Sequence, residues 1–130
     1  MQFTSPGNGT LTKIRLLVND TTPAGHVKVA IYDHNPATGL PGTLLWGGAS
    51  TSVVNGWMEW TTPAVSVKAN TIYWLVYWLD TGNGIRYQSE AGNHVWWFLT
   101  YGNWPSALTA SVGGSNSNQY VMQAVYQPAG

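Results

Sequence analysis

The sequence predicts an all-β fold: an antiparallel two-sheet β-sandwich, jelly-roll-like in arrangement, formed by a single domain over residues 1–130. Three observations indicate this. Short stretches rich in β-branched and aromatic residues recur at spacings of roughly 8 to 15 residues. Clusters of Gly, Pro, Asn and Ser separate them, as turns do. No stretch shows the 3.6-residue period and the capping residues of an amphipathic helix.

The first two predicted strands flank a turn. Residues 11–18 (LTKIRLLV) alternate between positions expected to face the core and positions expected to face solvent, which is typical of a half-buried strand. Residues 19–25 (NDTTPAG) have the composition of a turn. Residues 26–33 (HVKVAIYD) alternate again. Their predicted inward set is Val27, Val29 and Ile31, and their predicted outward set is Lys28, Ala30 and Tyr32.

A loop and a strand are predicted next. Residues 34–42 (HNPATGLPG) contain two Pro and two Gly, which predicts a long ordered loop rather than a tight turn. A strand opens at 43–46, and the pair Gly47-Gly48 is expected to break or bulge it.

Two more strands are predicted before the most apolar part of the chain. Asn55-Gly56 predicts a tight turn, since both residues tolerate positive φ. The turn leads into a strand over 56–61, and residues 65–68 predict a separate short strand. In the first of these strands, one side is predicted to carry Trp57 and Glu59, and the other Met58 and Trp60.

Residues 71–80 (TIYWLVYWLD) are the stretch around which the other strands are expected to pack. Their β-branched and aromatic side chains favour one long strand. Alternation divides them into a row of Ile72, Trp74, Val76 and Trp78 and a row of Tyr73, Leu75, Tyr77 and Leu79. Because both rows are apolar, the strand is either covered on both faces or leaves one aromatic row for a partner.

The C-terminal part is predicted to contain three strands. Residues 81–84 (TGNG) predict a hairpin into a strand that begins at Ile85. Residues 95–101 (VWWFLTY) predict an aromatic strand, and 120–127 the last one. Between these two lies a stretch rich in Gly, Ser and Asn.

Charge and composition exclude some partners. Charged residues make up 8 % of the chain, against roughly 25 % in typical soluble proteins, and five basic residues balance five acidic ones. We therefore expect no nucleic-acid binding, and no apolar run reaches the roughly 20 residues of a membrane span. Eight Trp and seven Tyr suit a neutral polysaccharide, although a turn-rich β protein also uses such residues in its core. The absence of Cys excludes disulfides and thiolate sites.

Part of the chain resembles a known kind of domain. The segments Ile31–Asp33, Leu40–Thr43 and Asn70–Val76 match the "v.iY", "xPGt" and "YWlv" motifs of small β-sandwich accessory domains of extracellular bacterial and archaeal proteins, of the "choice-of-anchor" and related uncharacterised type. The similarity covers about residues 10 to 80. It implies a jelly-roll-like module exported from a prokaryotic cell, often beside neighbouring domains, and it implies no catalytic residues.

Aromatic residues are the main candidates for a ligand site. Adjacent Trp96 and Trp97 point to opposite faces of a strand, so one of them faces solvent unless both faces are covered. Trp104 lies in a polar loop near Tyr101, and Tyr87 lies after the predicted hairpin. Exposed aromatic side chains mark binding sites, and a ring stacked on a base is worth about 1–3 kcal/mol, which we take by analogy for a sugar. The alternative is that these rings fill the core and its rim.

Polar candidates lie nearby. Arg86 and Glu90 are predicted to bond sugar hydroxyls beside the rings. The alternative is ordinary turn chemistry, in which Arg86 pairs with Glu90 or Asp80. No cofactor is predicted. Calcium is the metal option, since it prefers oxygen ligands. Its candidate ligands lie in two oxygen-rich loops: Asp33 and Asn35 in one, and Asp80 and Asn83 in the other.

An enzyme is not expected. A glycosidase needs two carboxylates across the scissile bond, and no motif brings Glu59 and Glu90 together. The sequence therefore predicts a non-catalytic, extracellular carbohydrate-binding or adhesive module that uses stacked Trp and Tyr. The alternative is a structural or self-assembling cell-surface or filament module, because low charge and free strand edges favour association with further copies.

Overall fold

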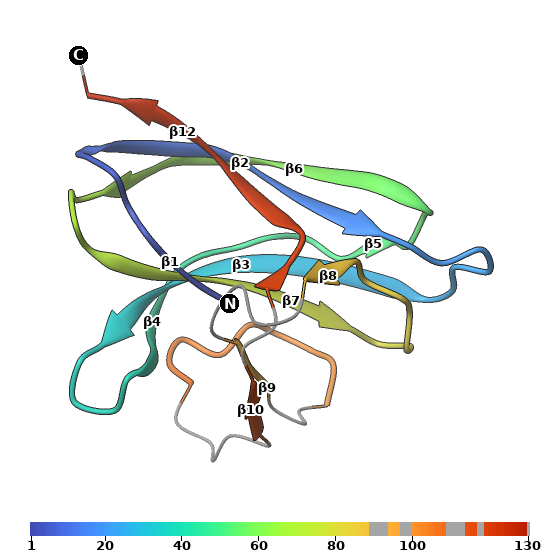
Figure 1. Ribbon diagram of the computed structural model, residues 1–130. Coiled ribbons are helices and arrows are strands. Elements are labelled where there is room, and N and C mark those ends of the chain that lie inside the picture. The colour runs from blue at the N-terminus through green and yellow to red at the C-terminus, as the bar shows by residue number, and fades with distance from the viewer. Residues whose placement is uncertain (89–93, 97–99, 109–113, 117–118, 130) are drawn as a thin grey trace.

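The computed structural model describes residues 1–88, 94–96, 100–108, 114–116 and 119–129. Two antiparallel sheets pack face to face in these parts of the chain (Figure 1), and the described residues contain no helix. The prediction of an antiparallel two-sheet β-sandwich is confirmed. No helix among the described residues is long and apolar enough to span a membrane.

The larger sheet has five strands. Four of them are hydrogen-bonded in the order β1-β7-β3-β4, and the short strand β5 also pairs with β3. Their bounds are β1 Gln2–Thr4, β3 His26–Asn35, β4 Leu40–Gly47, β5 Thr51–Ser52 and β7 Ile72–Leu79.

The smaller sheet has three strands in the order β12-β2-β6, with β2 in the middle. Their bounds are β2 Gly9–Val18, β6 Gly56–Val67 and β12 Met122–Pro128. Two short pairs lie outside both sheets: β8 Tyr87–Gln88 with β11 Gln119–Tyr120, and β9 His94–Trp96 with β10 Gly114–Asn116.

The main core lies between the two sheets, where alternation predicts it. Ile14, Leu16 and Val18 on β2 are at most 1 % exposed, and they meet the inward row of β3. The two rows predicted for the central run are also confirmed. Tyr73 and Leu75 of β7 face this core, whereas Trp74 and Val76 face the other side of the sheet.

The outer face of the five-stranded sheet is covered over Trp74, whereas Trp78 in the same row stays half-buried, so this face of the central run is covered only in part. A second cluster buries Ala30, Tyr32 and Trp74 completely, and the partly buried Trp104 and Leu108 pack against it. Lys28, Ala30 and Tyr32 do lie on the outward side of β3, but this side is not solvated. The segment 100–108, drawn in orange, lies against it on the side away from the three-stranded sheet (Figure 1).

Residues 34–42 do not form the long loop predicted from their Pro and Gly content. Strand β3 continues to Asn35 and β4 begins at Leu40, so the loop is a four-residue turn. The Asn35 carbonyl accepts bonds from the backbone N–H of Thr38 and Gly39, and its side-chain Oδ1 accepts one from Ala37 N at 3.0 Å. Gly39 has φ 71°, a conformation that Gly adopts without strain.

Residues 56–61 and 65–68 are joined in one strand, β6, instead of two. A register shift at Leu11–Lys13 on the partner strand β2 absorbs the irregularity. The buried Thr62 hydroxyl donates to Leu11 O there at 3.0 Å, which supplies a polar partner where the ladder is interrupted. The faces of this strand are as predicted, with Met58 and Trp60 buried and Trp57 exposed.

The hairpin predicted at 81–84 is wrong. After β7 the chain crosses to the other sheet, where Ile85 bridges Val18 of β2 and β8 pairs with β11. Gly84 O accepts a bond from Asn19 N at 2.8 Å, so the TGNG segment binds the 19–25 loop instead of returning to β7. Of the predicted strand 95–101, residues 95 and 96 belong to β9 (His94–Trp96), residues 100 and 101 are not in a strand, and 97–99 lie outside the described residues.

Candidate ligand-binding site

The candidate site lies on the outer face of the five-stranded sheet and includes two side chains from neighbouring strands. Lys28 on β3 and Trp78 on β7 are directly opposite each other in the antiparallel register. Directly opposed residues in such a pair project to the same side, with Cβ atoms about 4.5–5.5 Å apart. The backbone therefore places an ammonium beside an indole.

The segment 100–108 is fastened over this face by bonds to the strands beneath it. The Tyr32 hydroxyl donates to Pro105 O at 2.6 Å, and Leu44 N donates to Ser106 O at 2.8 Å. Thr43 and Ala107 form an isolated antiparallel bridge next to these bonds. Burial of the phenol raises the pKa of Tyr32 to about 12.

Trp104 is anchored within the same segment. Its indole Nε1 donates to Gly48 O at 3.0 Å, and its ring lies against Gly47 so closely that a Cβ there would collide with it. The Gly47-Gly48 pair, predicted to break a strand, ends β4 and also makes room for this indole. Trp104 is half-buried, and its ring meets Tyr32 edge-on with centroids 6.4 Å apart.

Three aromatic rings surround the Lys28 ammonium. Nζ lies 4.5 Å from the ring centroid of Trp78, 4.7 Å from that of Tyr101 and 5.2 Å from that of Trp104. We call these four residues the Lys28 cluster. Each contact falls within the range of a cation–π interaction, worth about 0.5–2 kcal/mol depending on desolvation.

The ammonium of the Lys28 cluster has no counter-charge among the described residues. Lys28 is only 7 % exposed, and burial lowers the pKa of its ammonium. The described residues form three ion pairs, and none of them includes Lys28. The rings are thus the only described groups that stabilise its charge.

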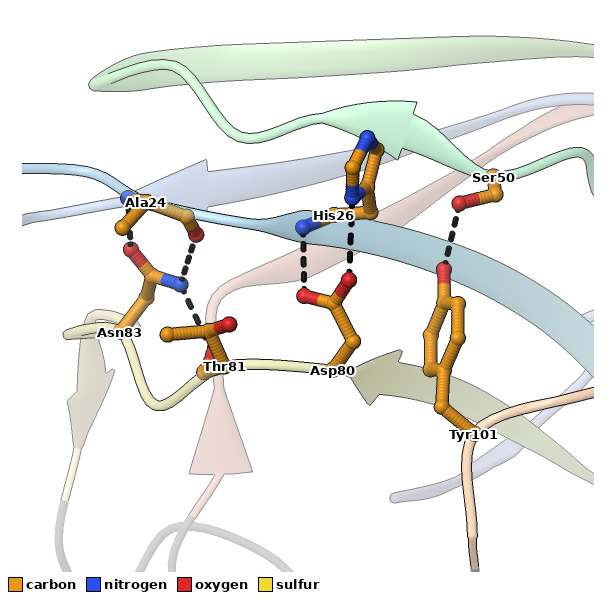
Figure 2. A network of polar contacts seen from close by, with 7 residues as sticks. All are labelled: Ala24, His26, Ser50, Asp80, Thr81, Asn83 and Tyr101. Carbon is orange, nitrogen blue, oxygen red and sulfur yellow. Dashed lines mark hydrogen bonds and ion pairs between the residues drawn. The ribbon is translucent and has the colours of Figure 1, made fainter.

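A hydroxyl pair lies at the rim of the cluster. The Tyr101 hydroxyl and Ser50 Oγ are 2.7 Å apart, and Figure 2 shows the phenol reaching Ser50 from the segment 100–108. Ser50 is exposed, whereas Tyr101 and Trp78 are half-buried. Ring faces, hydroxyls and an ammonium within one patch have the chemistry needed to hold a polyhydroxylated ligand.

Two of the seven predicted ligand-binding residues are brought together. Tyr101 and Trp104 meet in the Lys28 cluster, where both contact Trp78. Trp96 and Tyr87 belong to β9 and β8 through their backbones, and their side chains are outside the description. Trp97 and Glu90 lie outside the described residues. For these four side chains the prediction stays untested.

Arg86 is placed elsewhere. Its backbone N donates to Leu17 O at 3.1 Å, and its carbonyl accepts from Val121 N at 2.8 Å. These bonds hold it beside the three-stranded sheet and not on the outer face of the five-stranded one. Its side chain is exposed.

The four calcium candidates bond to protein groups. Asp33 Oδ1 accepts from Thr43 N at 2.6 Å, and Asn35 serves the four-residue turn described above. Asn83 forms two bonds with the backbone of Ala24, accepting at 3.0 Å and donating at 2.7 Å. The described residues contain no group of three His, Cys, Asp or Glu side chains suited to a metal. Calcium stays an untested prediction.

Asp80 fastens the end of β7 to the start of β3. Its Oδ1 accepts from His26 N at 2.6 Å, and its Oδ2 lies 2.9 Å from His26 Nδ1 (Figure 2). These bonds, the one from His26 N first, lower the pKa of the Asp80 carboxyl. Gly25 has φ 71°, and a Cβ there would collide with the Asp80 carboxylate.

A second aromatic surface lies on the outer face of the three-stranded sheet. Trp57 is 42 % exposed, and the Arg15 guanidinium lies over its ring at 4.4 Å. Arg15 also donates to Gln123 Oε1 at 3.1 Å and is 3.8 Å from Glu59, which in turn is 3.6 Å from Lys13. We call these five residues the Trp57 face.

Lys28 and Trp78 are not among the site residues that the sequence predicts. Alternation correctly gives the side of the strand on which each one lies, and that was the available signal. Their meeting depends on the register of β3 with β7, and alternation does not fix a register between strands that are about 50 residues apart in the sequence.

Comparisons of the chain with protein-family models, with curated proteins and with solved structures find no match. The resemblance to accessory domains of the "choice-of-anchor" type therefore stays a prediction.

Proposed function

We propose that this chain is a non-catalytic module that binds a glycan at the Lys28 cluster. An extracellular setting, expected from the resemblance, fits this function. The convergence of the Trp78, Tyr101 and Trp104 rings on one patch is the observation that carries the proposal. Aromatic faces bind the apolar faces of sugar rings, in the way that they stack with nucleic-acid bases.

The rings of the cluster are held in fixed positions. Trp104 is bonded to Gly48, Tyr101 is bonded to Ser50, and Trp78 is paired with Lys28 in the β3–β7 ladder. A ligand that stacks on them does not have to order them first, so less conformational entropy opposes binding. The hydroxyls of Ser50 and Tyr101 at the rim offer hydrogen bonds to sugar hydroxyls.

Titration with a panel of soluble polysaccharides, followed by intrinsic Trp fluorescence, tests this function. We expect a saturable change in the wild type that Tyr101→Ala and Trp78→Ala both weaken. Tyr101→Phe keeps the ring and loses only the bond to Ser50, so it should bind with a smaller loss. Trp57→Ala, on the other sheet, is the matched control.

Two results would refute the glycan site. One is a panel, extended by pull-down on insoluble polysaccharides, in which nothing binds. The other is binding that Tyr101→Ala and Trp78→Ala leave unchanged, provided that circular dichroism shows both variants folded.

A second candidate function is self-association through the Trp57 face. Trp57 and Val125, 42 % and 40 % exposed, lie on the outer face of a sheet whose edge strands are β6 and β12. Large exposed apolar side chains on a sheet face suit contact with a second copy of the chain. Light scattering after size exclusion should then show concentration-dependent dimers or larger species that Trp57→Ser abolishes. A monomer at the highest concentration would refute it.

A further inference from the structure

Lys28 is unusual because its side chain is largely buried while its ammonium has no oxygen partner among the described residues. The side chain is more than nine-tenths buried, and among the described residues it forms no hydrogen bond and no ion pair. A buried ammonium ordinarily bonds to a carboxylate or to several carbonyls, because desolvation without compensation is costly. Three ring faces compensate for part of this loss, but a ring accepts no conventional hydrogen bond.

The nearby acidic side chain does not supply the missing partner. Asp80 follows Trp78 by two residues, but both of its carboxylate oxygens are bonded to His26. His26 in turn precedes Lys28 by two residues on β3 and so lies on the same side of the strand. The Asp80 carboxylate is thus paired with His26 and forms no ion pair with Lys28.

We propose that the Lys28 ammonium recognises a carboxylate of the bound glycan, so that the ligand is an acidic polysaccharide built from uronic acids. This inference rests on the proposed glycan function and specifies its ligand class. The rings of Trp78 and Tyr101 stack with the sugar, and the carboxylate bonds to Nζ at the open side of the cluster. The ligand differs from the neutral glycan that the chain's balanced charge suggests.

The geometry favours a carboxylate over a hydroxyl. Both can accept from Nζ, but only the carboxylate neutralises a charge that the described residues leave unpaired. A charge-assisted bond of this kind is roughly twice as strong as a neutral one. The partly buried rings around Nζ lower the local dielectric constant, which strengthens the attraction further.

Oligogalacturonate and its methyl ester form a matched pair of probes, because esterification removes the charge and keeps the ring. Alginate oligosaccharides and their propylene glycol esters form a second pair with different sugar stereochemistry. Affinity for each is measured by calorimetry with the wild type and with Lys28→Met, which keeps an unbranched apolar side chain in the cluster. Lys68→Met removes a charge from an exposed lysine and serves as the control.

We expect at least one acidic probe to bind the wild type about tenfold to a hundredfold more tightly than its ester, as one charged hydrogen bond predicts. This preference should vanish in Lys28→Met and persist in Lys68→Met. If esters bind as well as acids, or if Lys28→Met keeps the preference, the carboxylate inference is overturned while glycan binding stands. If neither acids, esters nor the neutral panel bind, the proposed function itself fails.

Discussion

Lys28 and Trp78 are directly opposed across the pair β3–β7, and the Lys28 Nζ lies 4.5 Å from the centroid of the Trp78 ring. Neither side chain reaches the core between the sheets. The segment 100–108 lies against both and adds Tyr101 and Trp104, so a face that would be solvated in a simple sandwich becomes a partly buried aromatic cluster.

Lys28→Met should change the free energy of unfolding by less than about 1 kcal/mol. The substitution loses the cation–π contacts and also removes the desolvation of the ammonium, so the two effects oppose each other. Lys28→Ala should destabilise by about 2 kcal/mol because it also removes the buried methylene stem. Urea unfolding of both variants at neutral pH measures the difference. Equal and large losses would mean that the charge itself holds the cluster together.

Tyr32→Phe should lower the free energy of unfolding by about 1–3 kcal/mol, since Pro105 O loses its donor in a partly buried place. The variant should also change the response to alkali. The folded pKa of about 12 lies above the usual 10.0, so the protonated phenol's contribution is present below pH 10 and is lost as the pH rises toward 12. The free energy of unfolding, measured across this pH interval, should therefore fall more steeply for the wild type than for Tyr32→Phe. Parallel curves would contradict the assignment.

Asp80→Asn should lower the stability of the protein at neutral pH and make that stability less sensitive to acid. The folded carboxyl has a pKa below the usual 3.8, so its contribution is present above that value and is lost as the pH falls through the lowered pKa. Asparagine can still accept from His26 N but carries no charge for the ring of His26. Thermal unfolding from neutral to acidic pH tests this, and a variant that loses stability in acid as steeply as the wild type would count against it.

Trp74→Ala and Trp57→Ala should differ strongly although both remove an indole. Trp74 is fully buried and its Nε1 donates to His34 Nδ1 at 3.0 Å, so its loss should cost about 3–5 kcal/mol. Trp57 is 42 % exposed, and its loss should cost less than about 1 kcal/mol. Equilibrium denaturation of the two variants under the same conditions gives the comparison. Similar costs would imply that the Trp57 face is covered in solution, as self-association requires.

Much of the sandwich can be predicted from the sequence, because alternation along one strand is a local property. It separates Val27, Val29 and Ile31 from Lys28, and it separates Trp74 from Tyr73, as the structure bears out. It does not say what lies over a face. Lys28 and Tyr32 read as outward residues and are buried because a segment about 70 residues away in the sequence returns to cover them.

Turns were predicted less well, for a related reason. Gly and Pro content indicated a long loop at 34–42, but the side chain of Asn35 and the positive φ of Gly39 close it within four residues. Residues 81–84 have the composition of a hairpin, yet the Gly84 carbonyl accepts a hydrogen bond from Asn19 N, just after β2 of the other sheet. Composition marks where the chain turns, and long-range bonds decide where it goes next. The site shares this dependence, since two of its four residues were identified and the other two required the register.

The attachment of the segment 100–108 has a kinetic consequence. Its bonds to the sheet include those from the Tyr32 hydroxyl, Leu44 N, Leu108 N and the indole of Trp104, and none of these is a rung between β3 and β7. The segment can therefore detach as a unit while both sheets persist, a local opening of the kind that hydrogen exchange detects. The Leu44 amide would then exchange its proton faster than the β3–β7 amides. A ligand that contacts both Lys28 and Tyr101 would slow this exchange, because it would hold the segment 100–108 against the five-stranded sheet.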